Sequence, residues 1–312
     1  MAVDQLTGRR TGARPSHKRT HPGRARRRIG YWPYLIPGIA ASVLVIIGPF
    51  LMNVYVSFTK WTGIGDPRWI GLDNYTRLLS DSIFWGSFRN NIALILAIAI
   101  VPTLIGLMMA ATLFDYIGKK FGPRTASALR AAFYLPQLLP IAVAGVVWGW
   151  MLHPSYGALN QILGIKVNWL GDQDLALPTV MAVMVWFQLG YPLVIFMAAL
   201  QRIDPSLYEA AQIDGATWWQ RFRHITVPSI RPEIYVVLLT STVAALKVFG
   251  PIFVLTKGGP ARATIVPSYF SYQNFFEKAN VGYGSAIATV LAVIILVITF
   301  VFLRFQNTKD AR

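Results

Sequence analysis

Cysteine is absent from the sequence. This absence excludes structural disulfides, thiolate nucleophiles and zinc sites with cysteine ligands, so any loop outside the cell must hold its shape without a covalent cross-link. It leaves the redox compartment undetermined.

Charge is also scarce, because Asp, Glu, Lys and Arg make up only 13% of the 312 residues, whereas 54% are hydrophobic. A water-soluble globule of this length needs more charge to cover its surface. The composition therefore predicts an integral membrane protein.

Acidic residues are outnumbered by basic ones, 13 against 29, which gives a formal net charge of +16. Segment 1–33 is expected to be a disordered, solvated tail that stays in the cytoplasm and touches anionic membrane lipid. No folded nucleic-acid-binding module accompanies this tail, so nucleic acid is not an expected partner. The basic residues before the first apolar run are Arg9, Arg10, Arg14, Lys18, Arg19, Arg24, Arg26, Arg27 and Arg28.

Apolar runs of about 20 residues, each long enough to cross a bilayer as a helix, follow the tail. They predict an all-α integral membrane protein with six transmembrane helices, a six-span membrane domain over 34–306 and a short C-terminal tail over 307–312. The six runs are 34–58, 92–114, 131–152, 176–200, 234–255 and 285–305.

The first run is too long for the core of a secretion signal, and no cleavage pattern follows it, so it should remain as an anchor. With the basic tail inside, a multi-pass protein with six spans has both of its termini in the cytoplasm. The loops near 116–130 and 201–233 are then cytoplasmic. Those near 59–91, 153–175 and 256–284 face outward.

The loop over 204–228 contains two helix-start signals. Asp204 and Pro205 are typical of an N-cap and a first helical position, and they predict a helix that ends near Asp214. Gly215 then turns the chain. Thr217 followed by Gln220 resembles a capping box and predicts a second helix.

The second helix is amphipathic, because Trp218, Phe222 and Ile225 recur at helical spacing up to its expected end near Val227 and Pro228. One interpretation is a hairpin that rests on the membrane surface, with its aromatic residues at the headgroups. The other is a docking element for a soluble partner.

Spacing within this loop resembles a known signature. Glu209, Ala210 and Ala211 are followed after three residues by Gly215, after nine more by Ile225, and then by Val227 and Pro228. This is similar to the EAA motif of permease subunits of ABC importers, with valine in place of the usual leucine. The resemblance implies that Glu209, Ala210, Ala211 and Gly215, supported by Asp214, contact a separate ATPase subunit.

Two further motifs strengthen the resemblance: the stretch 71–75 with Phe84 and Trp85, and the stretch 256–260, which resembles a TxGGP element. Together they favour the MalF-like half of a sugar importer with the ABC type I importer permease fold. The implied partners are a homologous MalG-like permease, two ATPase subunits that carry ATP and Mg, and an extracytoplasmic solute-binding protein.

Polar and aromatic side chains inside the apolar runs indicate where a solute passes, because charge in hydrocarbon is costly. Amides and aromatic faces suit a sugar. The alternative is ordinary helix packing and aromatic residues at the membrane interface, or, for the lysine, snorkelling or a structural ion pair. Glycines 145, 149 and 190 and prolines 136, 140 and 192 permit close packing or kinks. The candidate residues of the solute path are Gln137, Trp148, Gln188, Tyr191 and Lys247.

No catalytic motif is visible. The sequence has no phosphate-binding GxxxxGK[ST] loop, no HExxH and no cluster of histidines, so we expect no catalytic residue, no metal site and no cofactor bound by this chain. ATP hydrolysis then belongs to another polypeptide, and the chain itself is not expected to be an enzyme.

The sequence argues against two other function classes. An ion-coupled secondary transporter needs carboxylates within its spans, but the apolar runs contain none, and Asp115 and Glu233 lie only at their ends. A membrane enzyme needs a convergent catalytic cluster. The expected function is uptake of a disaccharide or short oligosaccharide, with glycerol phosphate or another polyol derivative as the alternative solute.

Overall fold

The computed structural model describes residues 32–117 and 121–310. Nearly all of the basic tail predicted over 1–33 therefore lies outside the described residues. Contacts divide the chain into one unit that ends at Pro49 and a second that begins at Phe50. The described part of the first unit contains α1 (Trp32–Ser42), the π-helical segment η1 (Val43–Ile47) and the start of α2 (Gly48–Ser57).

Within the second unit, a two-stranded antiparallel hairpin of β1 (Thr59–Lys60) and β2 (Arg68–Trp69) precedes an otherwise helical structure. The first helices are α3 (Asp73–Ser80), α4 (Ser82–Ile95), η2 (Leu96–Ile100), α5 (Val101–Thr112) and η3 (Leu113–Ile117). They are followed by α7 (Pro123–Leu138), α8 (Ile141–Met151), α9 (Ala158–Leu163), α10 (Ala176–Gln188) and α11 (Gly190–Leu200).

The remaining segments of the chain are short helices and two long ones. They are α12 (Pro205–Ile213), α13 (Trp218–Arg221), η4 (Phe222–Thr226), α14 (Val227–Ser229), α15 (Arg231–Leu246), α16 (Gly250–Leu255), α17 (Pro267–Tyr272), η5 (Gln273–Glu277) and α18 (Val281–Asp310). The last helix extends into residues 307–310 of the predicted C-terminal tail.

Four continuous helices in the described part of the chain are long and apolar enough to cross a membrane, and the count is six if each of two bent pairs forms one span. The continuous helices are Tyr34–Ser57, Ser82–Asp115, Ala176–Leu200 and Val281–Arg304. They match the predicted first, second, fourth and sixth spans and confirm the all-α membrane fold.

The predicted third span, 131–152, is wrong as a single helix. The chain bends by 95° between Arg124–Leu138 and Ile141–Met151. Pro140 explains the break, because it lacks the N–H that a continuing helix needs and forces Leu139 into extended backbone, with ψ 137°.

The predicted fifth span, 234–255, is also interrupted. Helix α15 ends at Leu246 and α16 begins only at Gly250, with Pro251 in its first turn. A side chain from another span adds a hydrogen bond at the end of α15: Asn91 Nδ2 donates at 3.1 Å to Ala245 O, which also accepts from Val248 N at 3.1 Å. The second bent pair instead joins Trp218–Ser229 to Arg231–Leu246 at 71°.

Two buried apolar clusters hold the second unit together. One gathers residues of α3, α4, α10, α15 to α18 and the loops between them, and the other gathers residues of α5, η3, α11, η4 and α15. Close backbone approach helps this packing: a Cβ at Gly190 would lie 2.7 Å from Phe133 O, and one at Gly145 would lie 3.0 Å from Val254 Cγ1. A Cβ at Gly149 would meet nothing within 4 Å.

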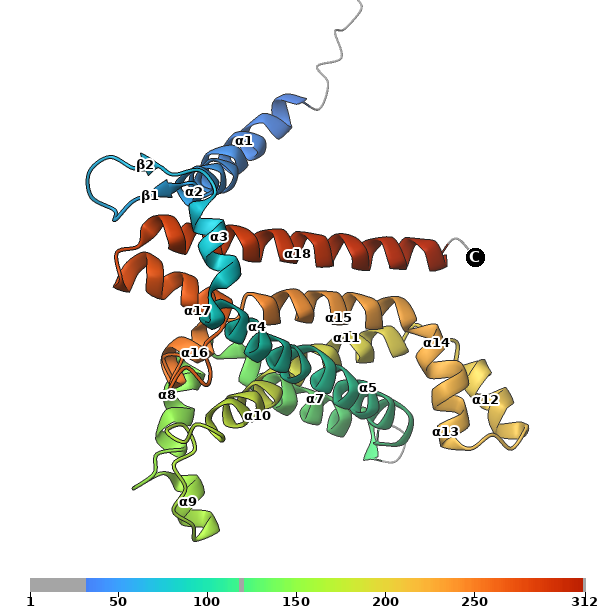
Figure 1. Cartoon of the computed structure of the whole chain (residues 1–312). Helices are drawn as coiled ribbons and strands as arrows, with labels where there is room; N and C mark the ends of the chain where they lie inside the picture. Colours follow the sequence, from blue (N-terminus) through green and yellow to red (C-terminus); the bar gives the residue numbers. More distant parts are fainter. Residues whose placement is uncertain (1–31, 118–120, 311–312) are drawn as a thin grey trace, which may run out of the picture. The chain divides into compact units, whose positions relative to one another are not determined.

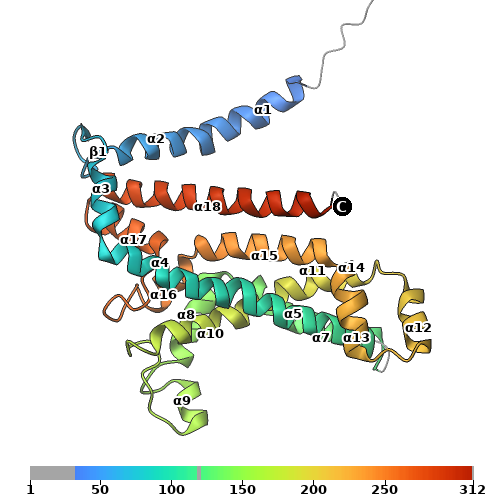
Figure 2. The ribbon, with the colours of Figure 1, turned by 45° about the vertical axis from the view of Figure 1, so that its right-hand side comes forward.

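Within the second unit, the loops predicted to be cytoplasmic gather at one end. Helices α12 and α13 lie there, at the same end as the C-terminal ends of α5 and α18 (Figures 1 and 2). The hairpin β1–β2, α9 and α17 lie toward the opposite end. The grouping of loops into two sets therefore agrees with the predicted order of spans.

Candidate functional site

Helix α12 begins as the sequence predicts. The Asp204 side chain caps it by accepting a hydrogen bond from Ser206 N at 2.9 Å, and Pro205 occupies the first turn. The backbone N–H of Ser206, followed by its side chain, lowers the pKa of Asp204 below the ordinary value because both stabilise the carboxylate. The helix ends at Ile213, with Asp214 as its C-cap.

Gly215 makes the turn after α12, as expected, with a φ of +76° that favours glycine. Ala216 N donates back to Ala211 O at 2.9 Å, and Gly215 N to Gln212 O at 3.1 Å. A Cβ at Gly215 would meet nothing within 4 Å, so backbone conformation alone requires glycine there.

The second helix begins at the predicted capping box. Gln220 N donates to Thr217 Oγ1 at 3.4 Å, and Thr217 N donates to Gln220 Oε1 at 2.7 Å. Helical structure continues through η4 and α14 to Ser229, slightly beyond the predicted end. Phe222 is buried and stacks on Trp218, with ring centroids 5.3 Å apart.

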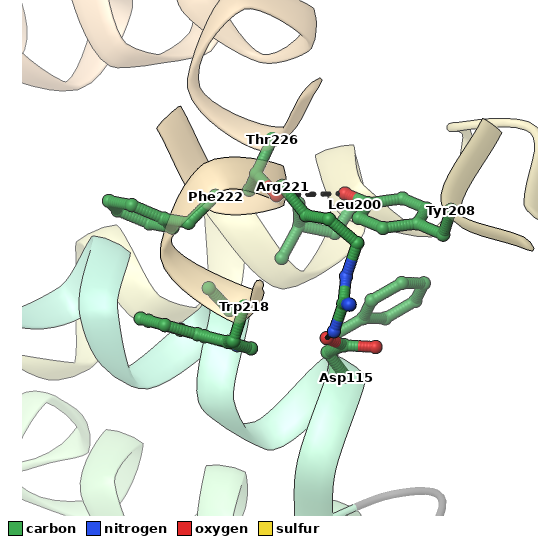
Figure 3. Close-up of a pocket in the computed structure, with 9 residues that line it drawn as sticks. Asp115, Leu200, Tyr208, Trp218, Arg221, Phe222 and Thr226 are labelled. Atoms are coloured by element: carbon green, nitrogen blue, oxygen red, sulfur yellow. Dashed lines mark hydrogen bonds and ion pairs between the residues drawn. The ribbon is translucent and has the colours of Figure 1, made fainter. Parts of the chain in front are cut away.

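Polar contacts fasten this helix pair internally and to the rest of the chain (Figure 3). The hydroxyls of Tyr208 and Thr226 lie 3.0 Å apart in a buried hydrogen bond between α12 and η4. Arg221 donates to Ala216 O in the turn at 2.9 Å and to Asp115 Oδ2 in η3 at 3.2 Å. We name residues 204–229 the coupling segment.

The five residues that the sequence predicts to contact an ATPase lie on the outer side of the coupling segment. Glu209, Ala210, Asp214 and Gly215 are exposed, and Ala211 is half-buried. At the turn lies an open hollow of about 390 Å³, lined by Ala211, Asp214, Gly215, Ala216, Gln220, Arg221, His224 and Ile225.

Large apolar side chains also stand exposed on this segment: Leu207 is 51% exposed, Ile213 87% and Trp219 54%. The neighbour of Leu207, Tyr208, is buried instead. Several exposed apolar residues on one short segment are typical of a surface that another molecule covers.

The candidate residues of the solute path fall into separate contacts. Gln137 Nε2 donates to Gln188 Oε1 at 3.2 Å, which joins α7 to α10. Trp148 meets Trp186 edge to face, with centroids 5.3 Å apart. Each pair joins two bundle helices.

The other two candidates of the solute path are Tyr191 and Lys247. Tyr191 OH lies 3.0 Å from Thr240 Oγ1, between α11 and α15. Lys247 is exposed at the C-terminal end of α15, at the interruption of the predicted fifth span. Interrupted helices with exposed polar groups are typical of solute and ion sites in transporters.

Titratable residues do not gather into a metal site in the described part of the chain: no group of three or more His, Cys, Asp or Glu side chains is placed to hold a metal ion. Asp115 and Arg221 were not predicted as functional residues. They are 106 positions apart, and only the folded structure brings them together.

Comparison with known proteins identifies the family. A model of the "binding-protein-dependent transport system inner membrane component" family matches residues 103–312. The chain belongs to this family. As a membrane component of transport systems, a member of this family is not itself an enzyme, as the sequence predicted.

Relatives of this permease family match along most of the chain. A probable ABC transporter permease of Pyrococcus horikoshii is 35% identical over 89% of this chain and 96% of its own. The trehalose/maltose transport system permease protein MalF of Thermococcus litoralis is 33% identical over 89% of this chain and 93% of its own.

A solved structure shares the fold. A chain of a bacterial ABC transporter involved in the import of the acidic polysaccharide alginate superposes with a TM-score of 0.75, at 25% identity, over 89% of this chain and 94% of its own. The ABC importer permease fold predicted from the sequence is therefore confirmed.

Proposed function

We propose that this permease is one membrane subunit of an ATP-driven importer of a carbohydrate, with a disaccharide or short oligosaccharide as its solute. The solute class is supported by the relatives, whose names specify trehalose and maltose in one case and alginate in another. Glycerol phosphate or another polyol derivative is the alternative solute.

The partners we propose are a homologous second permease, two ATPase subunits that bind ATP and Mg, and an extracytoplasmic solute-binding protein. The family description, which specifies a binding-protein-dependent system, supports the last of these. The chain itself binds no cofactor in this proposal. ATP binding and hydrolysis on the partner favour different arrangements of the spans, so a central pathway opens to each side in turn.

The observation that carries this proposal is the exposure of the motif residues. Glu209 and Asp214 present carboxylates, and Ile213 presents an apolar side chain, on a helix pair that is firmly packed on its other side. Such a surface is suited to burial under a soluble partner. We therefore assign ATPase contact to Glu209, Ala210, Ala211, Asp214 and Gly215.

Orientation follows from the same assignment. The coupling segment must face the cytoplasm to meet an ATPase, and the C-terminal end of α18 lies at the same end of the second unit (Figure 1). Both termini are then cytoplasmic in the inner membrane, with the basic tail against anionic lipid.

The test is purification of the complex from co-expressed neighbouring genes, followed by assays of ATP hydrolysis and uptake with the binding protein and a panel of sugars and polyol phosphates. The variants Glu209→Ala and Gly215→Pro should reach the membrane. The amount of solute that they import for each ATP hydrolysed should be at least tenfold lower than in the wild type.

Matched controls are Asp66→Ala, an exposed carboxylate outside the segment, and Gly164→Pro, at another glycine with positive φ and open space around it. Both should retain uptake. Unchanged uptake in both Glu209→Ala and Gly215→Pro would rule out the coupling role.

A further inference from the structure

Covalent connections join the coupling segment to only two of the spans. Its N-terminal end follows α11 through residues 201–203, and its C-terminal end enters α15 after Ile230 at a 71° bend. Neither connection leads to the Ser82–Asp115 helix. Any direct transfer of movement to that helix must therefore pass through side chains.

Arg221 supplies such a connection. Its guanidinium donates through one nitrogen to Ala216 O in the turn at 2.9 Å and through another to Asp115 Oδ2 at 3.2 Å. A single side chain thus joins α13, the turn after α12 and the end of the second span. Figure 3 shows Arg221 extending toward Asp115 from the helix that also carries Phe222.

Burial makes this contact stronger than an ordinary surface pair. The side chains of Arg221 and Asp115 are only 13% and 12% exposed. The Arg202–Glu233 pair lies nearby in sequence, but its arginine is 69% exposed, so water screens it. Removing one partner of a buried pair is far more costly than losing a surface pair.

Packing around the pair leaves little room for independent movement. The cavity between Asp115, Tyr208, Arg221 and their neighbours holds about 10 Å³, which is at most the space of one water molecule. Phe222 belongs to the same buried cluster as Leu107 and Ala111 of α5. A densely packed contact transmits displacement, because it cannot deform gradually.

We propose that Arg221 is a positioning residue that fixes the coupling segment to the end of the Ser82–Asp115 helix through Asp115, so that the segment and this span move as one unit when the ATPase acts. The inference rests on the proposed function. It assigns to this pair the transfer of movement to a span that the backbone of the segment does not reach.

The test uses the assembled complex and the variants Arg221→Gln, Asp115→Asn and the exchange Asp115→Arg with Arg221→Asp. Each single variant should still co-purify with the ATPase and hydrolyse ATP, but should import at least tenfold less solute for each ATP hydrolysed. The exchange should restore a substantial part of this ratio. Arg202→Gln, which breaks the exposed pair, should leave the ratio unchanged.

A second measurement covers the case in which the exchanged pair does not fold. Because the chain has no cysteine, the two cysteines of the double variant Asp115→Cys with Arg221→Cys can be cross-linked by a short bifunctional thiol-reactive reagent. Joining should raise the uptake for each ATP hydrolysed above that of the unjoined variant, because a covalent link replaces the ion pair.

Two results would overturn the inference: wild-type ratios of uptake to hydrolysis in both single variants, or no gain when the two cysteines are joined. If Glu209→Ala disturbs coupling while Arg221→Gln does not, the positioning role fails and the proposed function stands. If the wild-type chain associates with no ATPase, both fail.

Discussion

At the scale of single residues, close backbone contacts limit what each position tolerates. Gly190→Ala places a Cβ 2.7 Å from both Phe133 O and Tyr134 Cα, which are backbone atoms that cannot rotate away. We expect a loss of about 1–3 kcal/mol in the free energy of unfolding, as for other overpacked sites. Thermal unfolding of the purified protein in detergent measures it.

Gly149→Ala is the matched control for this substitution, because its Cβ would meet nothing within 4 Å. Alanine also has a higher helix propensity than glycine. The unfolding temperature of this control variant should equal or exceed that of the wild type. Equal unfolding temperatures for the two variants would show that α7 and α11 are not in close contact at Gly190.

The cap at Asp204 gives a prediction that depends on pH. Its lowered pKa means that the carboxylate stabilises α12 above the ordinary pKa of aspartate, about 4, and that this contribution is lost as pH falls through the lowered value. Asp204→Ala should speed amide exchange over 205–213 at neutral pH, but no longer do so in acid. Asp204→Asn keeps a side-chain acceptor and should protect the helix at both pH values.

Residue-level rules predicted the cap at Asp204, the capping box at Thr217 and the turn at Gly215, because each depends on atoms only a few positions apart. The pair of Asp115 and Arg221 followed from no such rule. Its charges become partners only after the second span and the coupling segment pack together, which a local pattern does not encode.

At the scale of elements, runs of apolar residues predicted where the spans lie but not where they break. Length and hydropathy were sufficient for the four continuous helices. The predicted third span breaks at Leu139–Pro140, where proline removes a backbone donor. The predicted fifth span breaks at 247–249, just before Pro251 in the first turn of α16. A hydropathy average over about 20 residues detects neither a missing backbone donor nor an interrupted helix.

At the break in the fifth predicted span, Asn91 is fully buried and donates to Ala245 O, which also accepts from Val248 N. Asn91→Leu removes one of these two hydrogen bonds and should cost about 0.5–1.5 kcal/mol in the free energy of unfolding. Thermal unfolding in detergent is the measurement. A variant as stable as the wild type would show that this hydrogen bond does not support the break.

At the scale of the whole molecule, the proposed orientation places the coupling segment and residues 153–175 on opposite sides of the membrane. Gln212 is exposed, and the chain has no cysteine of its own. The variant Gln212→Cys should therefore react with a membrane-impermeant thiol-reactive reagent only after the membrane has been permeabilised. A cysteine at Lys166, also exposed, should react in intact spheroplasts. The reverse pattern would contradict the orientation.

In the proposed mechanism, the helical bundle does no chemistry and is moved by a separate ATPase through the coupling segment. The most direct measurement compares solute accumulation in vesicles that contain the full complex with accumulation in vesicles that contain this chain alone. We predict accumulation against the gradient only with the complex and internal ATP. Accumulation by this chain without a nucleotide-hydrolysing partner would contradict the account.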